Sequence, residues 1–394
     1  MTVASQSEAR SFLVPPFLRV GGGALDSLGE ALTEVGARRA LLVTDAVMGK
    51  SDWIPRIVEL CDAQGVSVTK IDSVDSEPTS IDVGDALAAA LESDCDAVIG
   101  FGGGSALDTA KSAALLVTNG GSIVDYAGPY RFPKPGIPVI AIPTTAGTGS
   151  EVSRYVAIMD PVRDVKMHFT SDYLIPAAAI VDPVPTVTMP AGVTAATGID
   201  ALTHAIESYV AKTAHPMSDA MGISAIASIS KSLVRAFNEP DDLEARETMS
   251  VAATQAGIAF CNASVALVHG MARPLGAHFH IPHGVSNAML LETVMAYSIS
   301  GAPERYAAVG RAMGGRDGNG SDERAAWESV KLVGKMCRDL NIPSLAEWGV
   351  EEETFKGLAP KMAQDAIDSG SPANNPRVPS PDEIVDLYHR AYER

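Results

Sequence analysis

The feature that most constrains the fold of this chain is a change of residue periodicity near its middle. Between Arg39 and Asp182, short apolar, β-branched runs alternate with segments of helical pattern, as the βαβ units of a mainly parallel sheet do. After the proline-rich stretch 183–190 the strand pattern ends, and helical periodicity continues to Tyr392. The sequence therefore predicts an α/β domain over 1–184 and an all-helical domain over 185–394, each long enough for a core of its own.

The expected strands of the first half are nearly continuous in apolar residues, because helices should cover both faces of a parallel sheet. They are Ala40–Thr44, Val66–Ile71, Ala97–Phe101, Val139–Ile142 and Ala178–Val181, with helices at Ile81–Glu92 and Ala106–Val117. One pair of segments departs from this alternation: 153–159 and 164–170 flank a turn-rich tetrapeptide, which indicates a hairpin. We expect this hairpin to lie at the edge of the main sheet.

The composition narrows the functional classes. A formal charge of −18 repels polyanions, so nucleic acid is not expected as a partner. The four cysteines are scattered without a C-x-x-C pair, which is typical of a reducing compartment. No stretch reaches the roughly 18 consecutive apolar residues of a membrane span, and residues 1–10 lack an apolar signal region. These features favour a cytoplasmic protein without a membrane partner.

A glycine-rich turn is the first candidate binding element. Gly102, Gly103, Gly104 and Ser105 follow a predicted strand and open a predicted helix that carries Asp108. Glycines let the backbone approach a pyrophosphate, and the free N–H groups and dipole of a helix N-terminus favour an anion. A tight structural turn would use glycines as well, so this pattern alone does not decide between the two.

A carboxylate stands at the end of an earlier predicted strand. Asp45 directly follows the run 40–44. At that position a carboxylate accepts hydrogen bonds from an adenosine ribose and repels a 2′-phosphate, which favours NAD over NADP. A lone aspartate at such a position is more often a helix cap or a turn former than a ribose ligand.

The helical half contains a pattern typical of metal ligands. Asp200 and His204 are four residues apart, which places both side chains on one face of a helix. A Pro/Gly-broken segment downstream supplies more imidazoles, at His269, His278, His280 and His283. Three imidazoles and one carboxylate would hold Zn²⁺ or Fe²⁺ with a coordination position open. The residues alone leave open which of the clustered histidines bind.

Taken together, these motifs resemble the iron-containing (group III) alcohol dehydrogenases, which share a dehydroquinate-synthase-like fold with glycerol dehydrogenases. The resemblance extends over nearly the whole chain, through the segments 20–24, 102–105, 143–152, 198–207, 268–287 and 375–377. It implies a Rossmann-like dinucleotide domain, a helical metal-binding domain, and a homodimer or higher homo-oligomer. It also implies an NAD(H)- and metal-dependent oxidoreductase that interconverts a small alcohol and its aldehyde or ketone, with Fe²⁺ favoured over Zn²⁺.

The resemblance assigns roles to particular residues. The metal ligands that it implies are Asp200, His204, His269 and His283, which leaves His278 and His280 in second place. It puts Asp45 on the adenosine ribose and 102–105 on the pyrophosphate, with Asp108 counted among the cofactor residues. The remaining cofactor contacts that it implies are Thr144, Thr145 and Thr148 along the dinucleotide and Lys166 near a ribose.

Two positions depart from the family pattern. Arg273 stands where many relatives carry a second histidine near the reacting centre, and an arginine cannot relay protons because its pKa exceeds about 12. Three roles are open for its guanidinium. It could be structural, pointing outward or pairing with a nearby carboxylate. It could instead hold an anionic group of a short aldehyde substrate, or contact a cofactor phosphate. The second departure, 76–79, replaces a P-N-P-T turn on the adenosine side with Ser-Glu-Pro-Thr.

Other functions on this fold are alternatives. A dehydroquinate-synthase-like lyase would need a cluster of basic residues for a phosphorylated substrate, and the Asp-x-x-x-His pair at Asp200 and His204 resembles the dehydrogenases instead. Polyol oxidation of the glycerol-dehydrogenase type is a second alternative. A purely structural metal that ties the helices together is a third.

Overall fold

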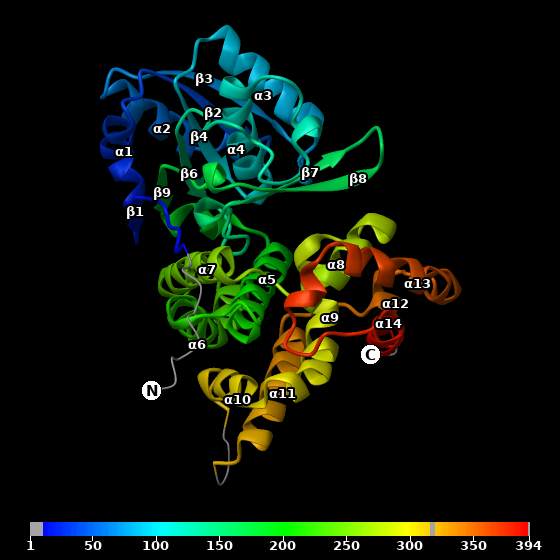
Figure 1. Ribbon diagram of the computed structural model, residues 1–394. Coiled ribbons are helices and arrows are strands. Elements are labelled where there is room, and N and C mark those ends of the chain that lie inside the picture. The colour runs from blue at the N-terminus through cyan, green and yellow to red at the C-terminus, as the bar shows by residue number, and fades with distance from the viewer. Residues whose placement is uncertain (1–10, 316–319, 393–394) are drawn as a thin grey trace, which may run out of the picture.

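The computed structural model describes residues 11–315 and 320–392 as an α/β domain followed by a helical domain (Figure 1). The main sheet has six strands, all paired in parallel. In spatial order they are β1 (Phe17–Val20), β9 (Ala178–Val181), β6 (Val139–Pro143), β4 (Ala97–Gly102), β2 (Arg39–Asp45) and β3 (Ser67–Val74). The predicted strands are confirmed. β1 was not predicted, because this short edge strand lacks the apolar continuity of the central ones.

Helices cover both faces of the main sheet, which explains the continuous apolar runs of its strands. On one face Leu42 of β2 packs in a core with α1 (Leu28–Val35) and α2 (Trp53–Asp62). On the other face Leu41 and Val43 pack with α3 (Ser80–Glu92) and α4 (Gly104–Asn119). Because successive side chains of a strand point to opposite faces, the four consecutive residues 40–43 of β2 are all apolar and buried.

The predicted hairpin forms, but its expected position was wrong. β7 (Tyr155–Asp160) and β8 (Val165–Thr170) pair antiparallel, and with β5 (Gly128–Pro129) they make a separate three-stranded sheet instead of extending the main one. The reason lies in the apolar face of the hairpin, where Ile158 and Phe169 pack against Leu115 of α4. The hairpin is therefore held by a helix and projects beside the main sheet (Figure 1).

Beyond Val181 the described residues contain helices and no strand. Three of these helices carry the candidate metal ligands: α5 (Ala191–Val210), α8 (Leu267–Phe279) and α9 (His283–Ser298). The others are α6 (Pro216–Asn238), α7 (Leu243–Ala263), α10 (Pro303–Ala312), α11 (Asp322–Asp339), α12 (Leu345–Trp348), α13 (Glu352–Asp368) and α14 (Pro381–Tyr392). One continuous hydrophobic core joins them. α5 lies at its centre against α6, α7 and α9, so most of its side chains are buried.

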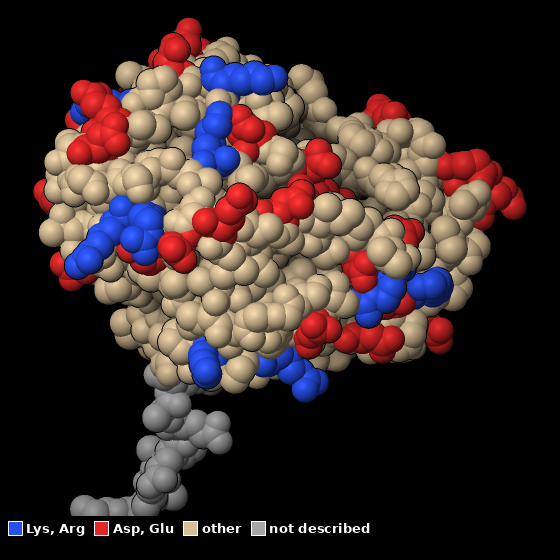
Figure 2. Space-filling model, turned by 90° about the horizontal axis from the view of Figure 1, so that it is seen from above, with Lys and Arg blue, Asp and Glu red and all other residues tan. Residues whose placement is uncertain are grey.

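The surface and the helix lengths add two observations. On the face shown in Figure 2, Lys and Arg side chains are scattered in small groups among Asp and Glu. Among the described residues, no single helix is long and apolar enough to cross a membrane; α7 and α8 reach that length and composition only as a pair, which is bent by 103°.

Candidate metal centre and dinucleotide cleft

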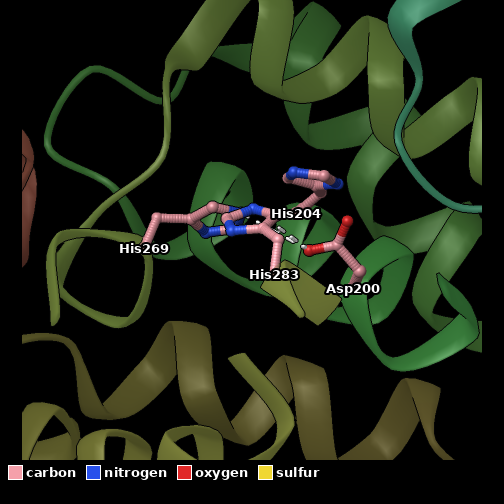
Figure 3. A group of neighbouring side chains, drawn as sticks. All are labelled: Asp200, His204, His269 and His283. Carbon is pink, nitrogen blue, oxygen red and sulfur yellow. Dashed lines mark ion pairs between the residues drawn. The ribbon is translucent and has the colours of Figure 1, made fainter. Parts of the chain in front are cut away.

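Four side chains from three helices converge at one point in the helical domain (Figure 3). They are Asp200 and His204 of α5, His269 of α8 and His283 at the start of α9, and their ligand atoms all lie within 4.8 Å of one another. Nε2 of His269 and Nε2 of His283 each lie 3.7 Å from Oδ1 of Asp200. Atoms at this separation can share one ion whose bonds are about 2.0–2.2 Å long.

The structure separates these imidazoles from the other clustered histidines. His278 lies nine residues after His269 in α8, and therefore on the opposite side of that helix. Its Nε2 lies 3.5 Å from a carboxylate oxygen of Asp365 instead. His280 ends α8 in a left-handed conformation, exposed and outside the cluster.

The protonation states suit a cation. Burial would raise the pKa of Asp200, but the imidazoles of His204, His283 and His269 outweigh it and hold that pKa below its usual range. Burial lowers the pKa of His204 to about 4 and that of His283 to about 3, against the opposing effect of Asp200. At neutral pH Asp200 is thus an ionised carboxylate and His204 and His283 are neutral imidazoles, which are the forms that bind a divalent metal.

Glu207 orients one imidazole of the cluster. Its Oε2 lies 2.6 Å from Nδ1 of His269, and its carboxylate also accepts the N–H groups of Ala266 (2.9 Å) and Val268 (2.6 Å) at the start of α8. Burial would lower the pKa of His269, but Glu207 and Asp200 outweigh it and raise that pKa to about 8. The contact directs Nδ1 of His269 to Glu207 and leaves Nε2 for the cluster, as an outer carboxylate does for a metal-bound histidine.

Asn287 shows that the lone pairs of the cluster converge. Its Nδ2 donates to Oδ1 of Asp200 at 2.6 Å and lies 3.2 Å from Nε2 of both His269 and His283. One electropositive group therefore faces three acceptor atoms, which is the electrostatic environment that a cation requires. No role was predicted for Asn287 or Glu207, although Glu207 follows Asp200 by seven residues on the same face of α5.

Aromatic rings form one wall of the cluster. The ring of Phe260 in α7 stacks on His204 with centroids 4.3 Å apart, and the ring of Tyr155 in β7 stacks on Phe260 with centroids 5.8 Å apart. These contacts link the hairpin of the α/β domain to the metal ligands of the helical domain.

The glycine turn packs against the threonine-rich loop 144–148. The N–H of Thr144 donates to the carbonyl of Gly102 at 2.9 Å, and a Cβ on Gly104 would lie 2.8 Å from Cγ2 of Thr148. Gly103 caps α4 without a side-chain hydrogen bond. The first N–H groups of α4 therefore have no side-chain cap, as a helix that binds a pyrophosphate requires.

Asp45 and Ser105 already have hydrogen-bond partners inside the chain. Oδ1 of Asp45 accepts the N–H groups of Val47 and Met48, both at 2.9 Å, while its Oδ2 faces the glycine turn, 3.3 Å from where a Cβ on Gly102 would lie. The hydroxyl of Ser105 donates to the carbonyl of Ser76 at 2.6 Å. Asp45 thus closes a turn with one oxygen and has the other beside Gly102.

The two remaining charged candidates, Asp108 and Lys166, also make contacts within the protein. Asp108 accepts from the Ser150 hydroxyl at 2.6 Å and from the N–H of Ala157 at 2.9 Å, so it anchors the hairpin to α4. Lys166 of β8 forms an ion pair with Glu77 of the departing turn 76–79.

Arg273 lies beside the metal cluster and is half-buried. It follows His269 by four residues on α8, which places both side chains on one face of that helix. Its Nη1 donates to the Ser371 hydroxyl at 3.1 Å, and over 11–315 and 320–392 no carboxylate forms an ion pair with it. The guanidinium is therefore held by one neutral partner and has donors available.

Known proteins share both halves of this arrangement. The family model for iron-containing alcohol dehydrogenase matches residues 15–183, and that for the C-terminal part of the Fe-containing alcohol dehydrogenase family matches residues 194–392. The NAD-dependent methanol dehydrogenase of Bacillus methanolicus is 36% identical to this chain, and the match covers 97% of this chain and 99% of that protein.

Solved structures have the same fold. The crystal structure of a 1,3-propanediol oxidoreductase has a TM-score of 0.94 at 35% identity and covers 97% of this chain and 100% of its own. The crystal structure of a sulfoacetaldehyde reductase from Bifidobacterium kashiwanohense, in complex with NAD⁺, has a TM-score of 0.86 at 27% identity. The match covers 98% of this chain and 99% of that one.

The fold and the site together define a class of enzyme. A parallel-sheet domain with an uncapped helix N-terminus, joined to a carboxylate–imidazole cluster, is the arrangement of a dinucleotide- and metal-dependent oxidoreductase. The chain belongs to the iron-containing alcohol dehydrogenase family. It is an NAD-dependent oxidoreductase of that family.

Gly284 permits a close approach that the cluster depends on. A Cβ there would lie 2.5 Å from the carbonyl oxygen of Ala196 in α5, so Gly284→Ala should push the start of α9, with His283, away from Asp200. We expect the Kd for Zn²⁺, measured by chelator competition, to rise by about 10- to 100-fold, the size of a change next to a metal ligand.

The matched control for this substitution is Gly192→Ala in the first turn of α5. A Cβ there would meet nothing within 4 Å, and alanine favours a helix over glycine by about 1 kcal/mol. This variant should bind Zn²⁺ like the unmodified protein. Equal Zn²⁺ affinity in the two variants would show that the approach of α9 to α5 does not shape the cluster.

Proposed function

We propose that this enzyme interconverts a small alcohol and an aldehyde that carries an anionic group, such as a carboxylate, sulfonate or phosphonate, and that Arg273 holds that group. The observation that carries the proposal is the Arg273 guanidinium, which lies on the face of α8 that bears His269 and has no carboxylate partner within the described residues. A planar guanidinium binds such anions through two parallel hydrogen bonds. The similarity to a reductase of sulfoacetaldehyde, an anionic aldehyde, supports it.

In this proposal each cofactor has its own set of residues. A divalent metal is held by Asp200, His204, His269 and His283, with Fe²⁺ favoured over Zn²⁺. When bound, it would act as a Lewis acid on the substrate oxygen. The turn 102–105 and the threonines of the loop 144–148 bind NAD, which supplies or accepts the hydride. Asp45 binds the adenosine ribose, and Lys166 lies near a ribose. Asp108 supports this site through the hairpin that it anchors.

The chain's own groups position the reaction. Glu207 keeps the ring of His269 in one orientation, and Asn287 holds the carboxylate of Asp200. Arg273 would hold the anionic end of the substrate at a set distance from this cluster. The carbonyl end of the substrate would then always face the metal side of α8.

We also propose the coarser organisation that the sequence suggested: domains at 1–184 and 185–394, a homodimer or higher homo-oligomer, and a cytoplasmic location. The four cysteines are free and buried, which agrees with a reducing compartment. Sedimentation equilibrium measures the oligomeric state directly, and a monomer would contradict the proposed assembly.

The metal ligands can be tested one at a time. His269→Ala and His283→Ala should each remove an imidazole, lower the metal content and abolish turnover, while far-UV circular dichroism stays unchanged. His278→Ala, on the opposite side of α8, should retain both metal and turnover. Elemental analysis of the purified proteins decides, and unchanged metal content in both ligand variants would refute the assignment.

The preference for NADH can be tested at Asp45. The carboxylate should repel a 2′-phosphate, so kcat/KM should be higher with NADH than with NADPH. Asp45→Asn keeps an acceptor for Val47 and Met48 but removes the charge, and it should narrow that ratio. Asp52→Asn, at an exposed position that caps no N–H group, should leave it unchanged. An unmodified enzyme that uses both cofactors equally would contradict the role of Asp45.

The proposed substrate class is tested by pairs of aldehydes that differ only in charge. The unmodified enzyme should reduce the anionic aldehyde with a higher kcat/KM than its neutral analogue. Arg273→Gln should lower kcat/KM for the anion by about 10- to 100-fold, mainly through KM, because a charge-assisted contact contributes about 1.5–3 kcal/mol.

Two controls accompany this test. Arg235→Gln removes a surface arginine that pairs with Asp242 and Glu244 on the exposed side of α6, and it should keep the preference for the anion. Faster reduction of the neutral aldehyde by the unmodified protein would instead favour a simple alcohol or a polyol as the substrate.

A further inference from the structure

The hairpin carries one histidine, His168, that no role described above uses. In β8, Met167 and Phe169 are buried in the core beneath the hairpin. Because side chains alternate along a strand, Lys166 and His168 point to the opposite face. His168 is reached by solvent, and over the described ranges its side chain makes no hydrogen bond or ion pair.

This face of the hairpin is the one that meets the metal centre. In the antiparallel register Tyr155 lies opposite Thr170, and Ala157 lies opposite His168, so all four side chains share one face. Tyr155 is also the residue whose ring stacks on Phe260, which in turn stacks on His204. His168 therefore projects from the same surface that contacts the wall of the cluster, on the hairpin that extends above α8 in Figure 1.

The position of His168 along β8 is fixed, as well as the side of the strand from which it projects. The N–H of Ala157, opposite His168, donates to Asp108 of α4 at 2.9 Å. On the same face Lys166 pairs with Glu77. With both ends of this short stretch anchored, the backbone that carries His168 is held in one position.

The charged and titratable groups that act on His168 come from three elements. They are Lys166 on its own strand, Arg273 and His269 on α8, and His283 on α9. Desolvation by the surrounding protein holds the pKa of His168 well below its usual value of 6.5, and the charges of Arg273 and Lys166 lower it further. At neutral pH His168 is therefore a neutral imidazole, able to accept a proton.

The other groups near the cleft are not suited to proton transfer. Arg273 keeps its proton because its pKa is above about 12 in water. The imidazoles of the cluster use their lone pairs for the metal. Lys166 is paired with Glu77, and burial raises the pKa of Tyr155.

We propose that His168 is the proton-transfer residue of this enzyme, an inference that rests on the proposed alcohol–aldehyde function of the same cleft. In the oxidation direction the O–H bond of the alcohol breaks and its proton passes to the imidazole of His168. The C–H electron pair leaves as hydride to NAD⁺, so that aldehyde, NADH and imidazolium result. Because its ring is reached by solvent, His168 then gives the proton to water, and reduction runs the same steps in reverse.

The first test is the pH profile of kcat/KM for alcohol oxidation by the Zn²⁺-loaded enzyme, with whichever alcohol it oxidises fastest. In the unmodified enzyme the rate should rise with pH as His168 loses its proton, below pH 6.5, and then level off. His168→Gln should lose this acid limb and run about 10²- to 10⁴-fold slower, and imidazole in the buffer should restore part of the rate. Its metal content and NADH affinity, measured by fluorescence, should not change.

His278→Gln is the matched control, because it removes a histidine from the far side of α8. It should keep both the rate and the acid limb. If His168→Gln keeps the acid limb and gains nothing from added imidazole, His168 is not the proton-transfer residue.

A second test needs no turnover and so separates this inference from the proposed function. NMR titration of ¹³C-labelled histidines in the Zn²⁺-loaded protein, with the His168 signal identified from its absence in His168→Gln, reports the pKa of His168 directly. Arg273→Gln removes a nearby positive charge and should raise that pKa. No response of that pKa to Arg273→Gln would show that His168 does not share a site with Arg273, and it would overturn the inference even in an enzyme that oxidises alcohols.

Discussion

The metal centre depends on the buried carboxylate of Glu207, which binds no metal in the proposed scheme. A carboxylate out of water is costly unless hydrogen bonds satisfy it, and here two backbone N–H groups at the start of α8 and Nδ1 of His269 do so. The same contacts join α8 to α5, which carries Asp200 and His204. One side chain thus positions a helix, orients a ring and brings together ligands from distant parts of the chain.

Glycines let the two domains approach each other closely. A Cβ on Gly147 would lie 2.5 Å from Cβ of Thr197 in α5, and a Cβ on Gly149 would lie 2.5 Å from Cα of Gly257 in α7. The loop that contacts the glycine turn of the dinucleotide side therefore also rests on the helices of the metal side. Its small residues are required twice, once beside the expected cofactor and once at the domain junction, so a larger side chain there would separate the hydride donor from the metal.

The charged and titratable side chains near the metal centre influence one another. Arg273 is permanently charged, so it can attract an anion and also keep a neighbouring imidazole neutral, but it cannot itself exchange protons. His168 comes from the hairpin of the other domain, on the hairpin face whose Tyr155 stacks on the aromatic wall of the cluster. In the two proposals, binding of the substrate's charge and transfer of its proton therefore belong to separate residues on separate domains.

Local sequence patterns by themselves determined the central strands and most of the metal site. Apolar runs predicted the central strands, the spacing of Asp200 and His204 predicted a shared helical face, and the resemblance selected His269 and His283, the two later histidines that the structure brings to that face. The tertiary structure alone decided where the hairpin lies, what Glu207 and Asn287 contact, and that the hairpin face with Tyr155 and His168 turns toward the metal centre. The physical reason is that periodicity reports which side of an element is buried, whereas these contacts join residues far apart in the chain and arise only when elements pack against each other.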